Sequence, residues 1–150
     1  MRYAQHTAVS SERSKAEIER LLTRYGATSF ASGWHNDQAV IQFQMHDRRI
    51  KFVLPLPSKA DKEFTHSKRG LRDERTIYAL WERATRQRWR ALALVVKAKL
   101  EAVETGITSF EDEFMAHIVM PGGKTVAEMA RPAIDQAYKS GKVVPLLTGW

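Results

Sequence analysis

The chain has 150 residues and carries 24 basic against 17 acidic residues, a net charge of +7, with 43% hydrophobic residues and no cysteine. This composition is typical of a folded domain and excludes both a disulfide framework and a thiolate metal site. Residues 1–14 lack the apolar run of a secretory signal, and the longest apolar stretch, residues 91–96, is too short to span a bilayer. We therefore expect a single cytoplasmic domain over residues 1–150, with no membrane contact.

The first predicted element is a helix. Ser14 and Glu17 have the spacing of a capping box, in which two side chains bind the free amide groups at a helix start. Apolar residues then recur every three or four positions up to Tyr25, and Gly26 can adopt the left-handed conformation that ends a helix. The pattern predicts a helix over residues 14–25.

An antiparallel sheet is expected next, because the apolar residues alternate with polar ones from residue 27 onward. The alternation predicts three strands, over about residues 28–34, 39–45 and 50–56, and Pro55 and Pro57 close this region. One face of the sheet packs on the core and the other faces solvent. The side chains expected on the outer face are Gln42, Gln44, Arg49 and Lys51.

The remaining chain is predicted to be a loop followed by helices. Residues 58–73 are polar and have no period, which indicates an exposed basic loop. Nothing breaks a helix over residues 74–105, and shorter helices follow Ser109 and the capping box of Thr125 and Glu128. The predicted fold class is α+β: helix and antiparallel sheet over 14–57, loop over 58–73, and a helical part over 74–150 with a long central helix and two shorter C-terminal helices.

The positive charge is concentrated in the middle of the sequence. Residues 48–99 contain fifteen basic and five acidic residues, a balance of +10, whereas the other residues contain nine and twelve, a balance of −3. A segregated charge creates a local field that attracts phosphate polymers or acidic protein surfaces. We expect an anionic partner.

Four cations of the long helix share one narrow arc, about 115° round the helix axis from the centre of its apolar stripe. They lie in the first two thirds of the helix, while Glu101 and Glu104 lie near its end, which is the reverse of the order that the helix dipole favours. Helix stability alone does not explain this order. The four cations are Arg83, Arg86, Arg90 and Lys97.

Other residues extend this candidate phosphate-binding row. Trp34 lies near a turn and is the best candidate for an exposed ring that stacks on bases, because the tryptophans of the long helix lie on its apolar stripe. The basic residues expected to lengthen the row are Arg49 and Lys51 on the sheet and Lys68, Arg69 and Arg72 in the loop.

Catalytic chemistry is not indicated by any motif. Glu113 and His117 share a helix face, but no third residue completes a known metal-ligand spacing, and no serine stands in a glycine-flanked nucleophile elbow. We expect no catalytic residue, no metal and no cofactor. A metal-dependent nuclease is the third hypothesis.

The order helix, three strands, helix over about residues 14–105, with Ser67, Lys68 and Arg69 before the second helix, resembles the layout of double-stranded-RNA-binding domains. The chain departs from that family in its much longer second helix and in lacking a short Gly-Pro turn between the first strands. The resemblance therefore concerns topology only.

A second resemblance covers most of the chain. It is similar to uncharacterised proteins of tailed phages and prophages in the segments EIERLL (17–22) with YGA (25–27), FVLPLP (52–57), and RWRAL (88–92) leading to KAKLE (97–101). This likeness implies a phage origin and brings no activity or catalytic residues. Small phage proteins serve DNA replication, recombination or packaging, or bind a host defence protein.

The first functional hypothesis is accordingly a non-enzymatic nucleic-acid-binding accessory protein of phage DNA metabolism, with single-stranded DNA preferred over duplex. The second is an interaction protein that docks the same cations on an acidic host protein and inhibits it. A homo-oligomer is compatible with both.

Overall fold

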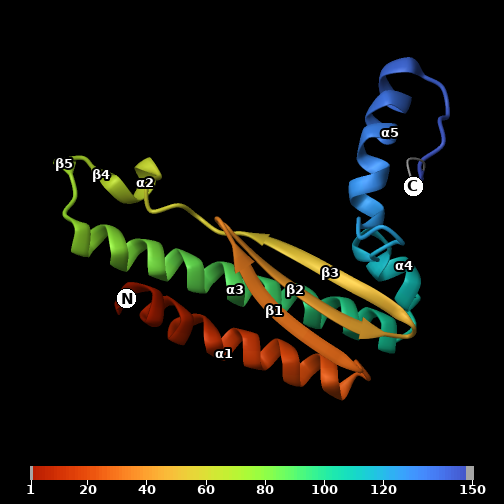
Figure 1. The fold of residues 1–150 in the computed structure, drawn as a ribbon, viewed down its shortest axis with the longest axis horizontal. Helices are drawn as coiled ribbons and strands as arrows, with labels where there is room; N and C mark the ends of the chain where they lie inside the picture. The colour runs from red at the N-terminus through yellow and green to blue at the C-terminus, as the bar shows by residue number, and fades with distance from the viewer. Residues whose placement is uncertain (1, 148–150) are drawn as a thin grey trace.

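The computed structural model describes the backbone of residues 2–147 and the side chains of residues 11–147. The element order is helix, three strands, long helix and shorter C-terminal helices, so the predicted α+β class is confirmed (Figure 1). The bounds are α1 Arg2–Arg24, β1 Ser29–His35, β2 Gln38–Met45, β3 Arg48–Pro55, α2 Lys62–Thr65, β4 His66–Ser67, β5 Gly70–Leu71, α3 Glu74–Glu104, α4 Phe110–Phe114, the 3₁₀ helix η1 Met115–His117, and α5 Val126–Ser140.

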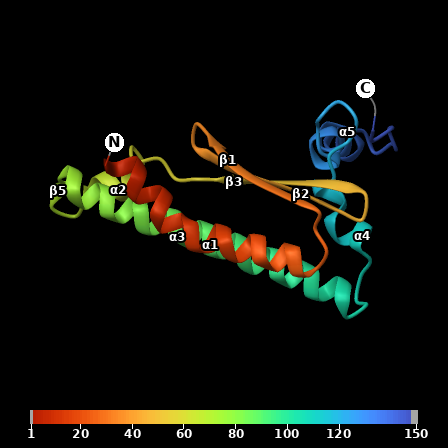
Figure 2. The same cartoon turned by 60° about the horizontal axis from the view of Figure 1, so that its bottom comes forward.

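The main body has two layers. Helices α1 and α3 lie side by side and run in the same direction, and the antiparallel sheet β1-β2-β3 covers one side of the pair (Figures 1 and 2). The alternating apolar residues of β2 and β3 point into this interface and α4 closes one end, where Phe114 packs edge-on against Phe43 and Phe52. The opposite face of the sheet has no layer of helices over it (Figure 2).

The register of the sheet follows from its tight turns. Phe43 of β2 pairs with Phe30 of β1 and with Ile50 of β3, so apolar side chains of all three strands share the helix-facing side. Beyond β3 the sheet continues for one bridge, from Ile50 to Ile118, and the Val119 amide donates to the Arg49 carbonyl at 2.8 Å. The start of the β3 edge is therefore covered, whereas β1 forms the other edge.

The predicted start of the first helix is wrong. Helix α1 begins at Arg2, not at Ser14, and Ser14 lies inside it. No glycine or proline occurs before Ser14, so nothing in the backbone prevents the helix from extending toward the N-terminus. Ser11, one turn before Ser14, is 2% exposed, which shows that the packed face of α1 continues through this part of the helix.

The predicted loop is also partly wrong. Residues 58–73 contain the short helix α2 and the two-stranded hairpin β4-β5, and α2 packs on α3 through the buried Phe64. The indole nitrogen of Trp81 donates to the Pro57 carbonyl at 2.7 Å and ties the start of this segment to α3. A single buried aromatic residue has no periodicity, so the pattern in the sequence did not reveal it.

The C-terminal helices form at the predicted caps. The Ser109 hydroxyl accepts from the Asp112 amide at the start of α4, and the Thr125 hydroxyl accepts from the Glu128 amide at the start of α5. Helix α5 extends away from the two-layer body (Figure 1). Within residues 2–147, no helix combines the length and apolar character that crossing a bilayer requires.

Candidate nucleic-acid interface

The four predicted cations of α3 form a row on its solvent-exposed surface, which we call the α3 ridge: Arg83, Arg86, Arg90 and Lys97. Burial of Thr85, Trp89 and Val96 against the body fixes the rotation of α3 and so holds the ridge outward. Arg83, Arg90 and Lys97 are exposed, and none of them has an acidic partner within 4.0 Å among the described residues. Their charges are available to an external anion.

Arg86 differs from its neighbours on the ridge. Its guanidinium lies 3.3 Å from the Glu82 carboxylate, one turn earlier on the same helix, and its side chain is 42% exposed. Part of its charge is therefore compensated within α3. The uncompensated part of the ridge consists of the other three cations, which span about 21 Å between Arg83 and Lys97 at 1.5 Å per residue.

Contacts on the opposite side of α3 show where the ridge points. Arg88 donates to the Pro55 carbonyl at 3.3 Å, and Lys99 lies 3.4 Å from the Glu113 carboxylate, so these side chains face β3 and α4. They stand about 180° round the helix axis from the ridge. The ridge consequently faces away from β3 and α4, on the side of α3 that borders α1.

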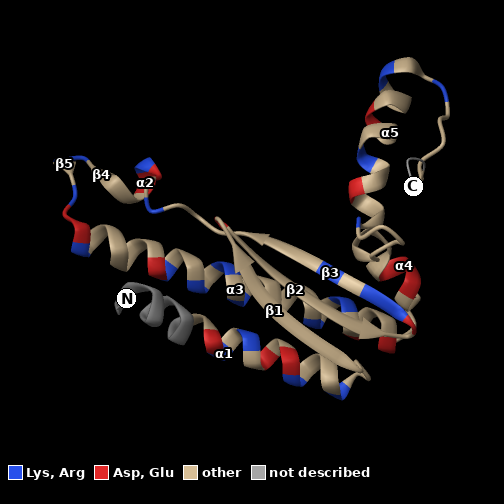
Figure 3. Cartoon of the chain, viewed as in Figure 1, with Lys and Arg blue, Asp and Glu red and all other residues tan. Residues whose placement is uncertain are grey.

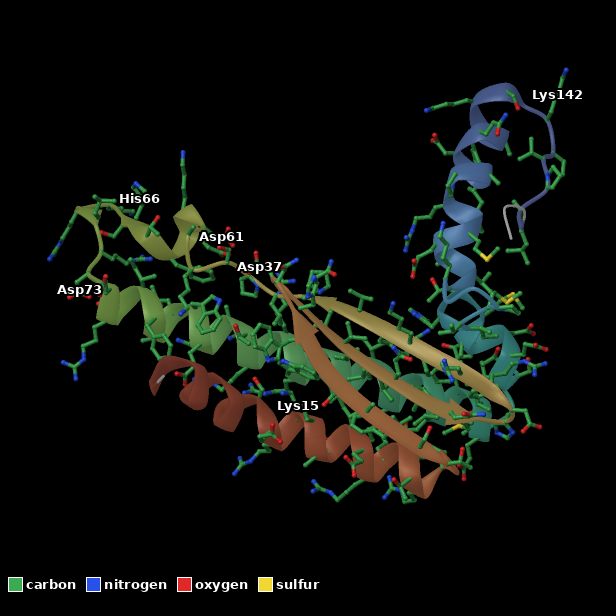
Figure 4. The ribbon with its side chains drawn as sticks, in the orientation of Figure 1. Lys15, Asp37, Asp61, His66, Asp73 and Lys142 are labelled. Atoms are coloured by element: carbon green, nitrogen blue, oxygen red, sulfur yellow. The ribbon has the colours of Figure 1, made fainter. Side chains whose placement is uncertain are left out.

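Helix α1 packs beside α3 and places one cation between the two helices. Lys15 lies between α1 and α3 (Figure 4), with its ammonium 5.1 Å from the centre of the Trp89 ring and 3.6 Å from the Glu12 carboxylate. The ammonium of Lys15 is thus held between Glu12 of its own helix and the Trp89 ring of α3.

The sheet cations lie in the other layer. Arg49 and Lys51 occupy the outer face with Gln44 and Gln42, their respective partners on β2, and the predicted outer face is confirmed. Figure 3 shows basic residues along α3 and at the start of β3, with no acidic residue on the three strands. The predicted row of cations is thus divided between two surfaces. One is the ridge on α3, and the other is the face of the sheet that points away from α3.

The predicted cations of residues 58–73 lie in a third part of the molecule, after the α3 ridge and the outer sheet face. Lys68 and Arg69 are exposed in the turn of the β4-β5 hairpin, beyond the first turn of α3 (Figure 1). Arg72 is engaged within the protein, since its guanidinium donates to the backbone carbonyls of Glu63 at 2.7 Å and Phe64 at 3.2 Å. Its geometry supports holding α2 in place rather than the predicted contact with a ligand.

Among the tryptophans with described side chains, Trp34 is the exposed one, as predicted, with 76% of its surface accessible. It pairs with Ala39, whose side chain is buried on the helix-facing side of the sheet, so Trp34 belongs to that side and not to the outer face. Trp89 is 2% exposed, and Trp81 is held by Pro57 and by the Lys59 ammonium, 4.6 Å from its ring centre. No described tryptophan stands on the α3 ridge.

The charge count over residues 48–99 missed the cations of α1. Arg13, Arg20 and Arg24 are exposed and lie within about 40° of one another round the helix axis. Their spacing of seven and four residues was a readable signal, but Glu17 and Glu19 on the same helix offset it. We do not include them in the ridge.

The cavity at the end of α3 is small. It has a volume of about 140 Å³ and lies between the end of α3 and the β2-β3 turn, lined mainly by Tyr25, Met45, Leu100 and Phe110. Pockets for small-molecule ligands are typically about 300–1,000 Å³. Within the described residues, no group of three or more histidine, cysteine or acidic residues could hold a metal ion.

Comparison of the chain with protein-family models, with curated proteins and with solved structures finds no match.

Proposed function

We propose that the protein is a non-enzymatic nucleic-acid-binding accessory protein whose ligand is single-stranded DNA. The observation that carries the proposal is the uncompensated row of Arg83, Arg90 and Lys97 on a long, straight helix. Guanidinium groups bind phosphate oxygens through paired hydrogen bonds, and a row of cations follows a phosphate backbone. The resemblance to phage proteins supports a role in phage DNA replication, recombination or packaging.

A single strand suits the ridge better than a duplex. One row of cations contacts one backbone, and α3 packs its other side on the body from Trp89 to Leu100. Without a described aromatic ring on the ridge, binding rests on phosphate contacts and is tolerant of sequence.

The direct test removes the three uncompensated cations. The variant Arg83→Ala, Arg90→Ala and Lys97→Ala should bind a fluorescent oligothymidylate at least about tenfold more weakly at low salt, because each lost charged hydrogen bond costs about 1.5–3 kcal/mol in favourable geometry. Fluorescence anisotropy measures the affinity, and a duplex of mixed sequence tests strand preference.

A matched control removes the same number of charges elsewhere. The variant Arg131→Ala, Lys139→Ala and Lys142→Ala takes three exposed cations from α5 and the residues after it. It should bind the oligothymidylate nearly as well as the wild type. If both variants lose the same affinity for the oligothymidylate, the loss comes from net charge and not from the ridge. If the wild type does not bind at low salt, the proposal is rejected.

A second candidate function is docking on an acidic host protein, and one observation favours it. Leu94 and Val95 of α3 are 64% and 44% exposed, and Leu94 lies beside Arg90 and Lys97. Apolar side chains beside cations are typical of a protein interface. The substitution Leu94→Gln should leave oligonucleotide affinity unchanged and should abolish capture of a specific acidic protein from host lysate, whereas Arg90→Glu should weaken both.

A further inference from the structure

The outer face of the sheet is a second cationic surface, separate from the α3 ridge. Two of its rows across the strands are Ser29, Gln44 and Arg49, and then Ala31, Gln42 and Lys51, and the next row is Gly33, Val40 and Val53. The strands contain no acidic residue, and neither Arg49 nor Lys51 has an ion-pair partner among the described residues. This face therefore carries two uncompensated charges.

The neighbours of these cations suit a polymer with both phosphates and polar edges. Gln42 and Gln44 present amide groups that donate and accept hydrogen bonds, as base edges require. The side chains of Ser29 and Ala31 on β1 are small, so the two glutamines remain accessible from the β1 side of the face. Helices α1 and α3 lie on the opposite side of the sheet, and α5 stands at the end of the sheet where β3 begins (Figures 1 and 2).

The two surfaces cannot serve one short, straight strand. Arg49 and Lys51 project from the sheet away from the helices, while the α3 ridge lies in the helix layer on the side that borders α1. A helix is about 10–12 Å across with its side chains, so at least that thickness separates the surfaces. A short strand bound at one surface leaves the other free.

We propose that the protein holds two nucleic-acid segments at once, one along the α3 ridge and one across Arg49 and Lys51 on the outer sheet face. This inference rests on the proposed function and adds bridging of two strands to it. The separation of the surfaces by the body of the protein favours tethering of two segments rather than direct alignment of their bases.

The first experiment counts ligands per protein. Native mass spectrometry with an oligothymidylate too short to reach both surfaces should show two molecules bound to one wild-type chain. The sheet variant Arg49→Thr and Lys51→Thr and the ridge variant Arg83→Ala, Arg90→Ala and Lys97→Ala should each bind one. Threonine is chosen on β3 because it favours strands.

The second experiment measures bridging itself. A biotinylated oligothymidylate on beads should retain a fluorescent oligothymidylate only when wild-type protein is present, and both surface variants should lose this retention. The control variant Lys139→Ala and Lys142→Ala removes two charges outside both surfaces and should keep it.

The outcomes separate the two proposals. Binding of one oligonucleotide per chain without retention of the second would overturn bridging and leave the proposed function standing. Retention that survives in the sheet variant would also overturn it, because the bridge would then come from self-association of chains that each bind one strand. A wild type that binds no oligonucleotide would remove both proposals.

Discussion

His117 illustrates how a single side chain combines packing and charge in this fold. Its ring stacks on Phe52 with centres 4.0 Å apart, at the end of the short 3₁₀ helix that leads to the fourth, one-bridge edge of the sheet. Burial lowers the pKa of His117 below its ordinary value of 6.5, and the positive charge of Lys99 acts in the same direction. A hydrogen bond to the Lys51 backbone opposes them.

This lowered pKa predicts a loss of stability in mild acid. The unfolded chain binds a proton at His117 more readily than the folded chain, so the free energy of unfolding falls as the pH drops below about 6.5 and levels off below the folded-state pKa. Urea midpoints at neutral and mildly acidic pH should differ less in His117→Phe, which keeps a ring against Phe52, than in the wild type. An equal acid-induced loss in both proteins would show that His117 is not responsible.

At the scale of single elements, a capping motif predicted the start of a helix correctly only where a turn precedes the motif. Ser109 and Thr125 follow turns that contain Gly106 and Gly122, whose positive φ angles end the preceding segment. Ser14 has the same capping spacing but follows a stretch that forms helix without interruption, so α1 passes through it. The capping spacing is present at Ser14, but no turn precedes it to start a new helix.

Two alanine substitutions test this difference. Ser109→Ala removes a hydroxyl that accepts from the Asp112 amide at 3.1 Å, and it should lower the free energy of unfolding by about 0.5–2 kcal/mol. Ser14→Ala lies inside α1, where alanine is the better helix former, and it should leave stability unchanged or raise it by a few tenths of a kcal/mol. Urea unfolding measures both. A cap-sized loss in Ser14→Ala would place the helix start where the sequence pattern put it.

The longest elements were predictable because their patterns persist over many residues. Helix α3 was expected over residues 74–105 and spans Glu74–Glu104, and the alternation of β2 and β3 correctly assigned Arg49 and Lys51 to the outer face. The packing of residues 57–65 on α3 was not predictable, since the burial of Phe64 and the hydrogen bond from Trp81 to Pro57 depend on tertiary structure. The same holds for Arg72, whose partners are backbone carbonyls.

At the scale of the whole molecule, the arrangement of layers determines which basic residues share a surface. Residues 48–99 are strongly basic in sequence, yet their cations are distributed over α3, the outer sheet face and the β4-β5 hairpin (Figure 3). Periodicity gives the face of each element but not the position of one element relative to another. The ridge could thus be predicted within α3, whereas its separation from Arg49 and Lys51 follows only from the fold.

The central claim, that Arg83, Arg90 and Lys97 bind phosphates, is tested most directly by the salt dependence of oligothymidylate affinity. For a single strand, the logarithm of the association constant falls by about 0.7 per neutralised phosphate for each log unit of salt. Replacing the three cations by alanine should therefore reduce the slope by about 2, and the α5 control variant should keep the wild-type slope. A slope that is the same in the wild type and the ridge variant would contradict the account.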